Sequence, residues 1–130
     1  MITVANNKIS SQFFLKNYDK TQRRIVKRIL NTQHWNSFTN SAVKQALVTG
    51  TLFRILRFTD KNPTLIIAVI VHWADELKSH EYPAHTILRP IRNLDDDLIS
   101  RQLKSTLIAT ITEIFRNNNF DFTKYALAYC

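Results

Sequence analysis

Residues 62–80 read NPTLIIAVIVHWADELKSH. The leading Asn-Pro pair is typical of a helix start, because Asn caps the first turn and Pro fits the first helical position. Residues 65–74 are apolar on nearly every side of a helix, which predicts a central helix covered by others. The β-branched residues in this run also fit a buried strand. The helical period continues through Trp73 and Leu77, and therefore favours a helix.

The segments around this central helix show helical periodicity and are separated by polar or Pro-containing breaks. We predict a basic helix from Asp19, as its cap, to about Leu30, a second from Asn40 or Ser41 to Phe58, a long one with Asp95, Asp96 and Asp97 at its head that ends near Arg116, and a short one after Asp121. Residues 80–90 carry two prolines and predict a kinked connection with one helical turn. Residues 1–9 predict a loosely ordered lead-in. The fold class is therefore all-α, a compact bundle of about five helices in one domain, 1–130.

Apolar residues at spacings of three and four predict which side of each helix faces the core. The predicted core positions are Ile25, Val26, Ile29 and Leu30; Val43, Ala46, Leu47, Gly50, Phe53 and Leu56; and Leu98, Ile99, Leu103, Leu107, Ile108, Ile111, Ile114 and Phe115. Gly in mid-helix costs about 1 kcal/mol relative to Ala. A close helix–helix approach at Gly50 is the expected compensation. His72, beside Trp73, is expected to be a core histidine.

Composition excludes several classes of protein. A chain of 130 residues with 45% hydrophobic residues can bury a core. The one cysteine, Cys130, permits no disulfide within the chain and suits a reducing cytosol. The longest apolar run, 65–71, is far shorter than the roughly 20 residues of a spanning helix, and the N-terminus lacks the pattern of a secretory signal. We expect a soluble cytoplasmic protein.

The positive charge is unevenly distributed. The chain has a net charge of +8, yet residues 1–62 carry eleven Lys/Arg and two acids, whereas residues 63–130 carry seven Lys/Arg and eight acids. The two halves therefore carry +9 and −1. Such an asymmetry makes a one-sided positive field, whose usual partner is a nucleic-acid backbone or an acidic membrane.

The basic residues of the first half fall into two rows on predicted helices. The first row occupies an arc of roughly 140° on a helix of 100° per residue. It consists of Lys16, Lys20, Arg23, Arg24, Lys27 and Arg28. The second consists of Arg54, Arg57 and Lys61, with Lys44 about 80° away on the same helix. We interpret all ten as nucleic-acid-binding residues that contact phosphates.

Other interpretations of these rows remain open. A charge run of this kind is often only a solvated helix face. A basic amphipathic helix also binds anionic membranes, but the apolar side of this one is short and has no aromatic anchor. His34, Trp35 and Phe38 suit either stacking on unpaired bases or packing in the core.

No catalytic or metal-binding pattern emerges. His80 and His85 are five residues apart, which is not the spacing of two ligands on one helix face. Asp95, Asp96 and Asp97 are better explained as helix-capping acids than as cation ligands. A single glycine rules out Gly-rich phosphate loops. The sequence thus predicts a protein that is not an enzyme and uses no metal or cofactor.

Residues 70–99, IVHWADELKSHEYPAHTILRPIRNLDDDLI, carry a resemblance to a known family. The segment resembles the C-terminal part of the large subunit of type I-D CRISPR effector complexes, with an H-x-[IL]-L-R-P stretch that here runs from His85 to Pro90. The whole chain resembles the small subunit of such complexes. The resemblance implies that several copies stack along a guide-RNA complex, contact target and displaced DNA strands through their backbones and catalyse nothing. The alternative is a small helical module that binds an acidic protein partner.

Overall fold

The described part of the chain is helical throughout its regular elements. The computed structural model describes residues 20–30 and 40–122, and describes side chains in the first helix from residue 24 onward. The helices are α1 Lys20–Ile29, α2 Ser41–Phe58, α3 Pro63–Ser79, α4 His85–Arg92 and α5 Arg101–Arg116. These residues contain no strand. The prediction of an all-α bundle of about five helices is confirmed, while Asp19, the lead-in at 1–9 and residues 123–130 lie outside the described residues.

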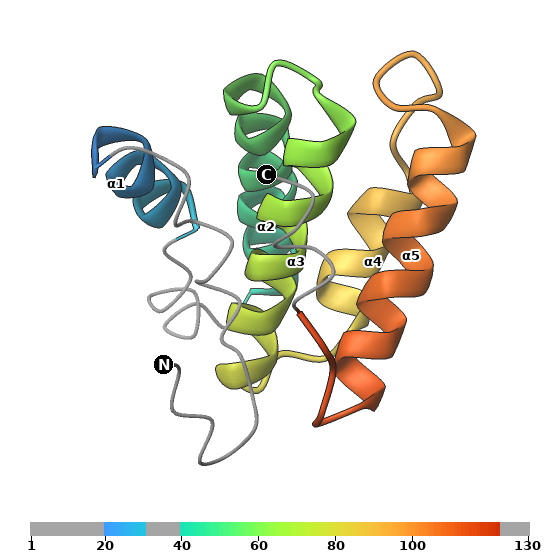
Figure 1. Cartoon of the computed structure of the whole chain (residues 1–130). Coiled ribbons are helices and arrows are strands. Elements are labelled where there is room, and N and C mark those ends of the chain that lie inside the picture. The colour runs from blue at the N-terminus through green and yellow to red at the C-terminus, as the bar shows by residue number, and fades with distance from the viewer. Residues whose placement is uncertain (1–19, 31–39, 123–130) are drawn as a thin grey trace.

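The helix that starts at Pro63 is the centre of the bundle, as predicted. The Oδ1 atom of Asn62 accepts a hydrogen bond from the Leu65 backbone N at 3.2 Å, which caps the first turn. Nine side chains of α3 are buried. α3 contacts both α2 and α5, and Figure 1 shows it between them. Its apolar surface is therefore covered on more than one side, as expected of a helix without a polar face.

The remaining helices surround α3 unequally. α1 contacts α2, whereas α4 contacts both α2 and α5. Figure 1 shows α1 and α2 at one side of the bundle and α5 at the other. After α5 the chain returns to the core, because Phe122 is only 1% exposed. Its ring meets that of Phe120 in an edge-on arrangement with centroids 4.8 Å apart.

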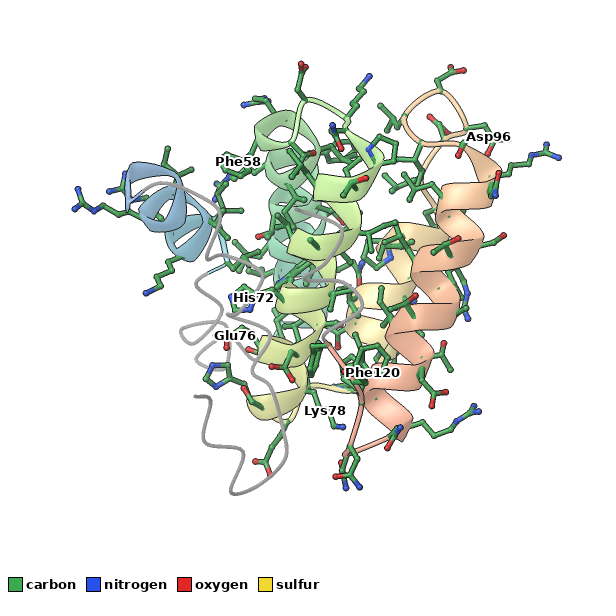
Figure 2. All side chains as sticks on the ribbon, in the orientation of Figure 1. Phe58, His72, Glu76, Lys78, Asp96 and Phe120 are labelled. Carbon is green, nitrogen blue, oxygen red and sulfur yellow. The ribbon has the colours of Figure 1, made fainter. Side chains whose placement is uncertain are left out.

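Two lysines of the second half cap helices through tertiary contacts. The Lys78 Nζ donates to the Ile114 carbonyl at 2.7 Å and to the Asn117 carbonyl at 3.4 Å. Figure 2 shows Lys78 at the end of α3, beside the C-terminal end of α5. The Lys104 Nζ donates to the carbonyls of Leu94 and Arg92. Each ammonium thus satisfies carbonyls at a helix C-terminus, where a positive charge is favoured.

The predicted kinked connection at residues 80–90 is wrong, because most of it belongs to an eight-residue helix. α4 begins at His85 and includes Pro90. A proline inside a helix removes one backbone hydrogen bond and costs about 3 kcal/mol. Four apolar residues of α4 are nevertheless buried, namely Ile87, Leu88, Pro90 and Ile91. The burial of these side chains offsets that cost. This burial depends on tertiary packing, which the local sequence does not reveal.

The predicted head of the last helix is also wrong. α5 begins at Arg101, and Ser100 caps it by accepting a hydrogen bond from the Leu103 backbone N at 3.1 Å. The three aspartates precede this cap in a turn flanked by the buried side chains of Leu94 and Ile99. The Arg101 guanidinium donates to Asp96 at 2.8 Å and lowers the pKa of that carboxyl. Figure 2 shows Asp96 beside the start of α5. The predicted core positions of α5 are confirmed as buried or half-buried.

The predicted core face of α2 is right at three of six positions. The buried residues are Val48, Thr51, Leu52, Ile55 and Leu56. Of the predicted core residues, Leu56 is buried and Leu47 and Gly50 are half-buried. The other three, Val43, Ala46 and Phe53, are exposed. Both sets recur at spacings of three and four, so periodicity alone does not distinguish them. The side chosen by the fold carries the larger aliphatic residues.

The expectation of a close helix–helix approach at Gly50 is wrong as well. Beyond its own turn of helix, a Cβ atom built on Gly50 meets no heavy atom of the described residues within 4 Å, and the residue lies in mid-helix. Gly50→Ala should therefore raise the free energy of unfolding by about 1 kcal/mol, because alanine restricts the unfolded chain and fits the helix without a clash. Urea denaturation checks this, with Ala46→Gly one turn earlier in α2 as the reciprocal control. A loss of stability in Gly50→Ala would contradict the observed space.

His72 is a core histidine, as predicted, with 3% of its surface exposed. Burial lowers its pKa from 6.5 to about 4; the nearby Asp75 carboxylate opposes this shift, and the Lys27 ammonium adds to it. The contribution of Lys27 indicates that α1 lies close enough to α3 for its charge to act on the imidazole. His72 is therefore neutral at pH 7.

The pKa of His72 predicts loss of stability in weak acid. Below pH 6.5 the unfolded chain protonates this histidine, whereas the folded chain does so only near pH 4. The free energy of unfolding should therefore fall by about 3 kcal/mol as the pH drops from 7 to 4. Urea denaturation at several pH values measures this, with His72→Gln as the control. An unchanged pH dependence in His72→Gln would contradict the assignment to this residue.

Candidate nucleic-acid interface

The outer face of α1 presents its cations to solvent. Arg24, Lys27 and Arg28 are exposed, and Val26 and Leu30 on the opposite side are buried. The predicted inward apolar face is only partly right, because Ile29 is half-buried and Ile25 is 38% exposed. Lys16 and the side chains of Lys20 and Arg23 lie outside the part that the structure describes.

The structure keeps the second predicted row together and places Lys44 away from it. Arg54, Arg57 and Lys61 are exposed at the C-terminal end of α2 and in the turn after it. Lys44 is half-buried near the other end of α2, where it lines a cleft with residues of α4. Its contact with phosphates stays a prediction. Arg54 and Arg57 lie on α2, which α1 contacts directly, and Figure 1 shows the two helices as neighbours.

A hollow of about 310 Å³ lies at the end of α2. It is lined by Phe53, Leu56, Arg57, Asp60 and Lys61. Phe53 is 43% exposed, which makes it one of three large hydrophobic side chains that are exposed in the described part of the chain. An exposed aromatic ring in one hollow with two cations and a single carboxylate combines a surface for base stacking with contacts for phosphates.

The backbone after α2 holds this hollow in a fixed shape. Asp60 and Lys61 both have positive φ, at 51° and 58°. The Lys61 backbone N donates to the Leu56 carbonyl at 3.2 Å, and the Thr59 Oγ1 donates to the Ile55 carbonyl at 2.8 Å. These bonds close the last turn of α2 in the manner of a left-handed helix cap, although such conformations favour glycine. Lys61 is thereby positioned beside Arg57 by the main chain.

The cations of α1 and of the C-terminal end of α2 differ from Lys78, Arg101 and Lys104 of the second half in whether they have an interaction partner. Asp96 of the second half forms ion pairs with Arg101 at 2.8 Å and with Lys104 at 3.8 Å. Among the residues that the structure describes, no ion pair or hydrogen bond from a side chain engages the six cations Arg24, Lys27, Arg28, Arg54, Arg57 and Lys61. Lys78 and Lys104 are held by helix carbonyls. Arg89, Arg92 and Arg116 of α4 and α5 are likewise unengaged among the described residues, so the cations that remain available for a ligand are more numerous on α1, α2 and the turn after α2 without being confined to them.

The aromatic residue at this surface is not one that the sequence had indicated for stacking. His34, Trp35 and Phe38 lie outside the described residues, so their expected role stays a prediction. Phe53 had been assigned to the core. The signal that was available is its position one residue before Arg54 and four before Arg57, on a helix whose larger aliphatic side chains lie on the opposite face.

Neither metal-ligand clusters nor membrane spans were found among the described residues. No group of three or more His, Cys, Asp or Glu side chains lies close enough to hold an ion in residues 20–30 and 40–122. Over the same residues, none of the helices combines the length and apolar character that crossing a membrane requires. Comparisons with protein-family models, with curated proteins and with solved structures gave no match to this chain.

Proposed function

We propose that this chain is a non-catalytic protein that binds single-stranded nucleic acid by its backbone, across α1 and the C-terminal end of α2. The observation that carries this proposal is the set of six exposed cations that form no ion pair among the described residues, together with the exposed ring of Phe53 in a hollow that two of them line. In contrast, a merely solvated charge run does not require an adjoining exposed aromatic ring.

The chemistry of this surface fits an unpaired strand. Lysine and arginine that neutralise phosphates release condensed counterions, so affinity depends on salt and not on sequence. The Phe53 ring offers a stacking platform for one base, and every base has a π-face. Because Arg57 and Lys61 line the same hollow, the phosphates on either side of that base are within reach of a cation.

We further propose that the setting is a CRISPR RNA-guided effector complex, in which the chain acts as a cytoplasmic small subunit in antiviral defence. The support is the resemblance of residues 70–99, which here form much of α3, all of α4 and the turn before α5. In such a complex the guide RNA reads sequence, and the protein supplies backbone contacts to RNA and target DNA. Several copies of the chain, next to other subunits, would supply avidity.

Phe53→Ala should weaken binding to single-stranded DNA roughly tenfold, because stacking of one base contributes about 1–3 kcal/mol. Duplex DNA should be nearly unaffected, because its bases are already stacked on one another. Fluorescence anisotropy with labelled 20-nucleotide DNA and RNA, at two salt concentrations, measures both effects.

The matched control for this variant is Val43→Ala, which truncates another exposed apolar residue of α2. Binding that is independent of salt in the unchanged protein would contradict the proposal, and so would equal losses in the two variants. Recovery of an acidic protein partner after nuclease treatment, without any affinity for DNA or RNA, would instead support the protein-interaction module.

A further inference from the structure

A second concave site lies where the first turns of α2 meet α4. This cleft measures about 420 Å³ and is separate from the hollow at Phe53. Its polar lining includes Lys44 and Gln45 from α2, together with His85, Thr86 and Arg89 from α4. His85 and Arg89 are four residues apart and so share one face of α4. Two helices that contact each other thus present polar side chains to one volume.

Among the described residues, the charged side chains that line the cleft are all cations. They are Lys44 and Arg89, and no carboxylate of those residues joins them. Lys44 is half-buried and Arg89 is exposed, and two cations beside one cleft repel each other while it holds no anion. Neither residue takes part in an ion pair or a hydrogen bond from its side chain within the described residues. The missing countercharge indicates an anionic ligand, and an Arg beside a Lys is a typical phosphate-binding pair.

The rest of the cleft is suited to an apolar, flat group. Val48 and Tyr82, which are 1% and 8% exposed, line it together with Pro83 and Ala42. The volume lies within the range of about 300–1,000 Å³ that small-molecule sites occupy, and such sites combine an apolar wall with a few polar groups. We propose that this cleft binds a nucleoside phosphate, with the phosphate on Lys44 and Arg89 and the base against the wall formed by Tyr82 and Pro83.

This site is distinct from the strand-binding surface. Lys44 and Arg57 are thirteen residues apart on α2, which places them about 20 Å from each other along the helix axis. The proposal therefore does not rest on the proposed function. A nucleoside phosphate has two possible sources, a free nucleotide or the phosphorylated end of a strand, and the two present the same chemistry to the cleft.

The test is an NMR titration of the full ¹⁵N-labelled chain with AMP. Saturable shifts are expected at backbone amides of residues 41–48 and 82–89, and not at residues 53–61. Lys44→Gln and Arg89→Gln should each weaken AMP binding roughly tenfold, since each removes one charge-assisted contact to the phosphate. Adenosine and inorganic phosphate should each bind more weakly than AMP, because each fills only part of the cleft.

The matched control is Arg92→Gln, which removes an exposed cation of the same helix that does not line the cleft. Its affinity for AMP should stay within about twofold of the unchanged protein. A 5′-phosphorylated oligonucleotide that shifts these amides, where its 5′-hydroxyl counterpart and AMP do not, would identify a strand end as the source. The proposal would be overturned if neither AMP nor the 5′-phosphorylated oligonucleotide caused saturable shifts. Equal losses of AMP affinity in Arg92→Gln and Arg89→Gln would also overturn it. Fluorescence anisotropy of Phe53→Ala with single-stranded DNA tests the proposed strand-binding surface independently of this cleft.

Discussion

Replacing Arg24, Lys27 and Arg28 together with glutamate should lower the affinity for single-stranded DNA roughly a thousandfold at low salt. Each substitution removes a cation that can neutralise a phosphate and adds a charge that repels it. All three side chains are exposed on one side of α1, where no ion pair engages them within the described residues. Fluorescence anisotropy with a labelled single strand measures the loss.

A milder version of this substitution tests the mechanism. Glutamine at the same three positions should reduce the slope of log affinity against log salt by about 2, because a single strand contributes about 0.7 per neutralised phosphate. The matched control is glutamate at Arg92, Arg101 and Arg116, which changes the net charge by the same amount on the other side of the bundle. If both triple variants lose affinity equally, net charge and not the α1 surface is responsible.

Leu77→Ala should lower the free energy of unfolding by about 3–5 kcal/mol, which is a large part of the total for a single domain. Leu77 is fully buried in α3, which both α2 and α5 contact. Truncation leaves a cavity that rigid helices on either side fill only partly. Urea denaturation followed by circular dichroism measures the change.

The control for this variant is Ile25→Ala, which truncates an aliphatic residue that is 38% exposed. It should cost less than about 1 kcal/mol, because much of its side chain already contacts water. Should Leu77→Ala prove as mild as Ile25→Ala, α3 would not be the centre of the core.

The elements that the sequence predicted well are those with one strong local signal. The Asn62-Pro63 start and the helical period that continues to Leu77 favoured a helix over a buried strand for α3, and the core positions of α5 followed from its period. The turn before α5 was harder, because three consecutive aspartates resemble a helix head. Ser100 is the better cap, and the burial of Leu94 and Ile99 holds the aspartates in the turn before it.

α2 shows why periodicity did not locate the candidate site completely. Its sequence contains two apolar stripes of the same period, and only contacts with α3 and α4 determine which one is buried. Choosing the other stripe assigned Phe53 to the core, although its side chain is exposed. In contrast, the cations of α1 were predictable because no competing apolar stripe exists on their side.

The helix-capping roles of Lys78 and Lys104 could not be predicted from the neighbouring sequence. Their partners are carbonyls ten to 39 residues away in sequence, brought close by the packing of α3, α4 and α5. A count of charges treats these ammonium groups as equivalent to those of α1. The fold instead uses them to close helix ends, and this leaves the second half with fewer positive charges to offer than its composition indicates.

The attachment of α1 has a consequence for hydrogen exchange. Among the described residues, this helix and the residue after it contribute only Val26 and Leu30 to the buried core, whereas α3 contributes nine buried side chains. Opening of α1 should therefore require less free energy than global unfolding, and its amides should exchange sooner than those of α3. A strand bound across its cations would oppose that opening, since ligand binding stabilises the bound form. A bound nucleic acid would thus slow hydrogen exchange in α1, whereas the amides of α3 are already protected by burial in the core.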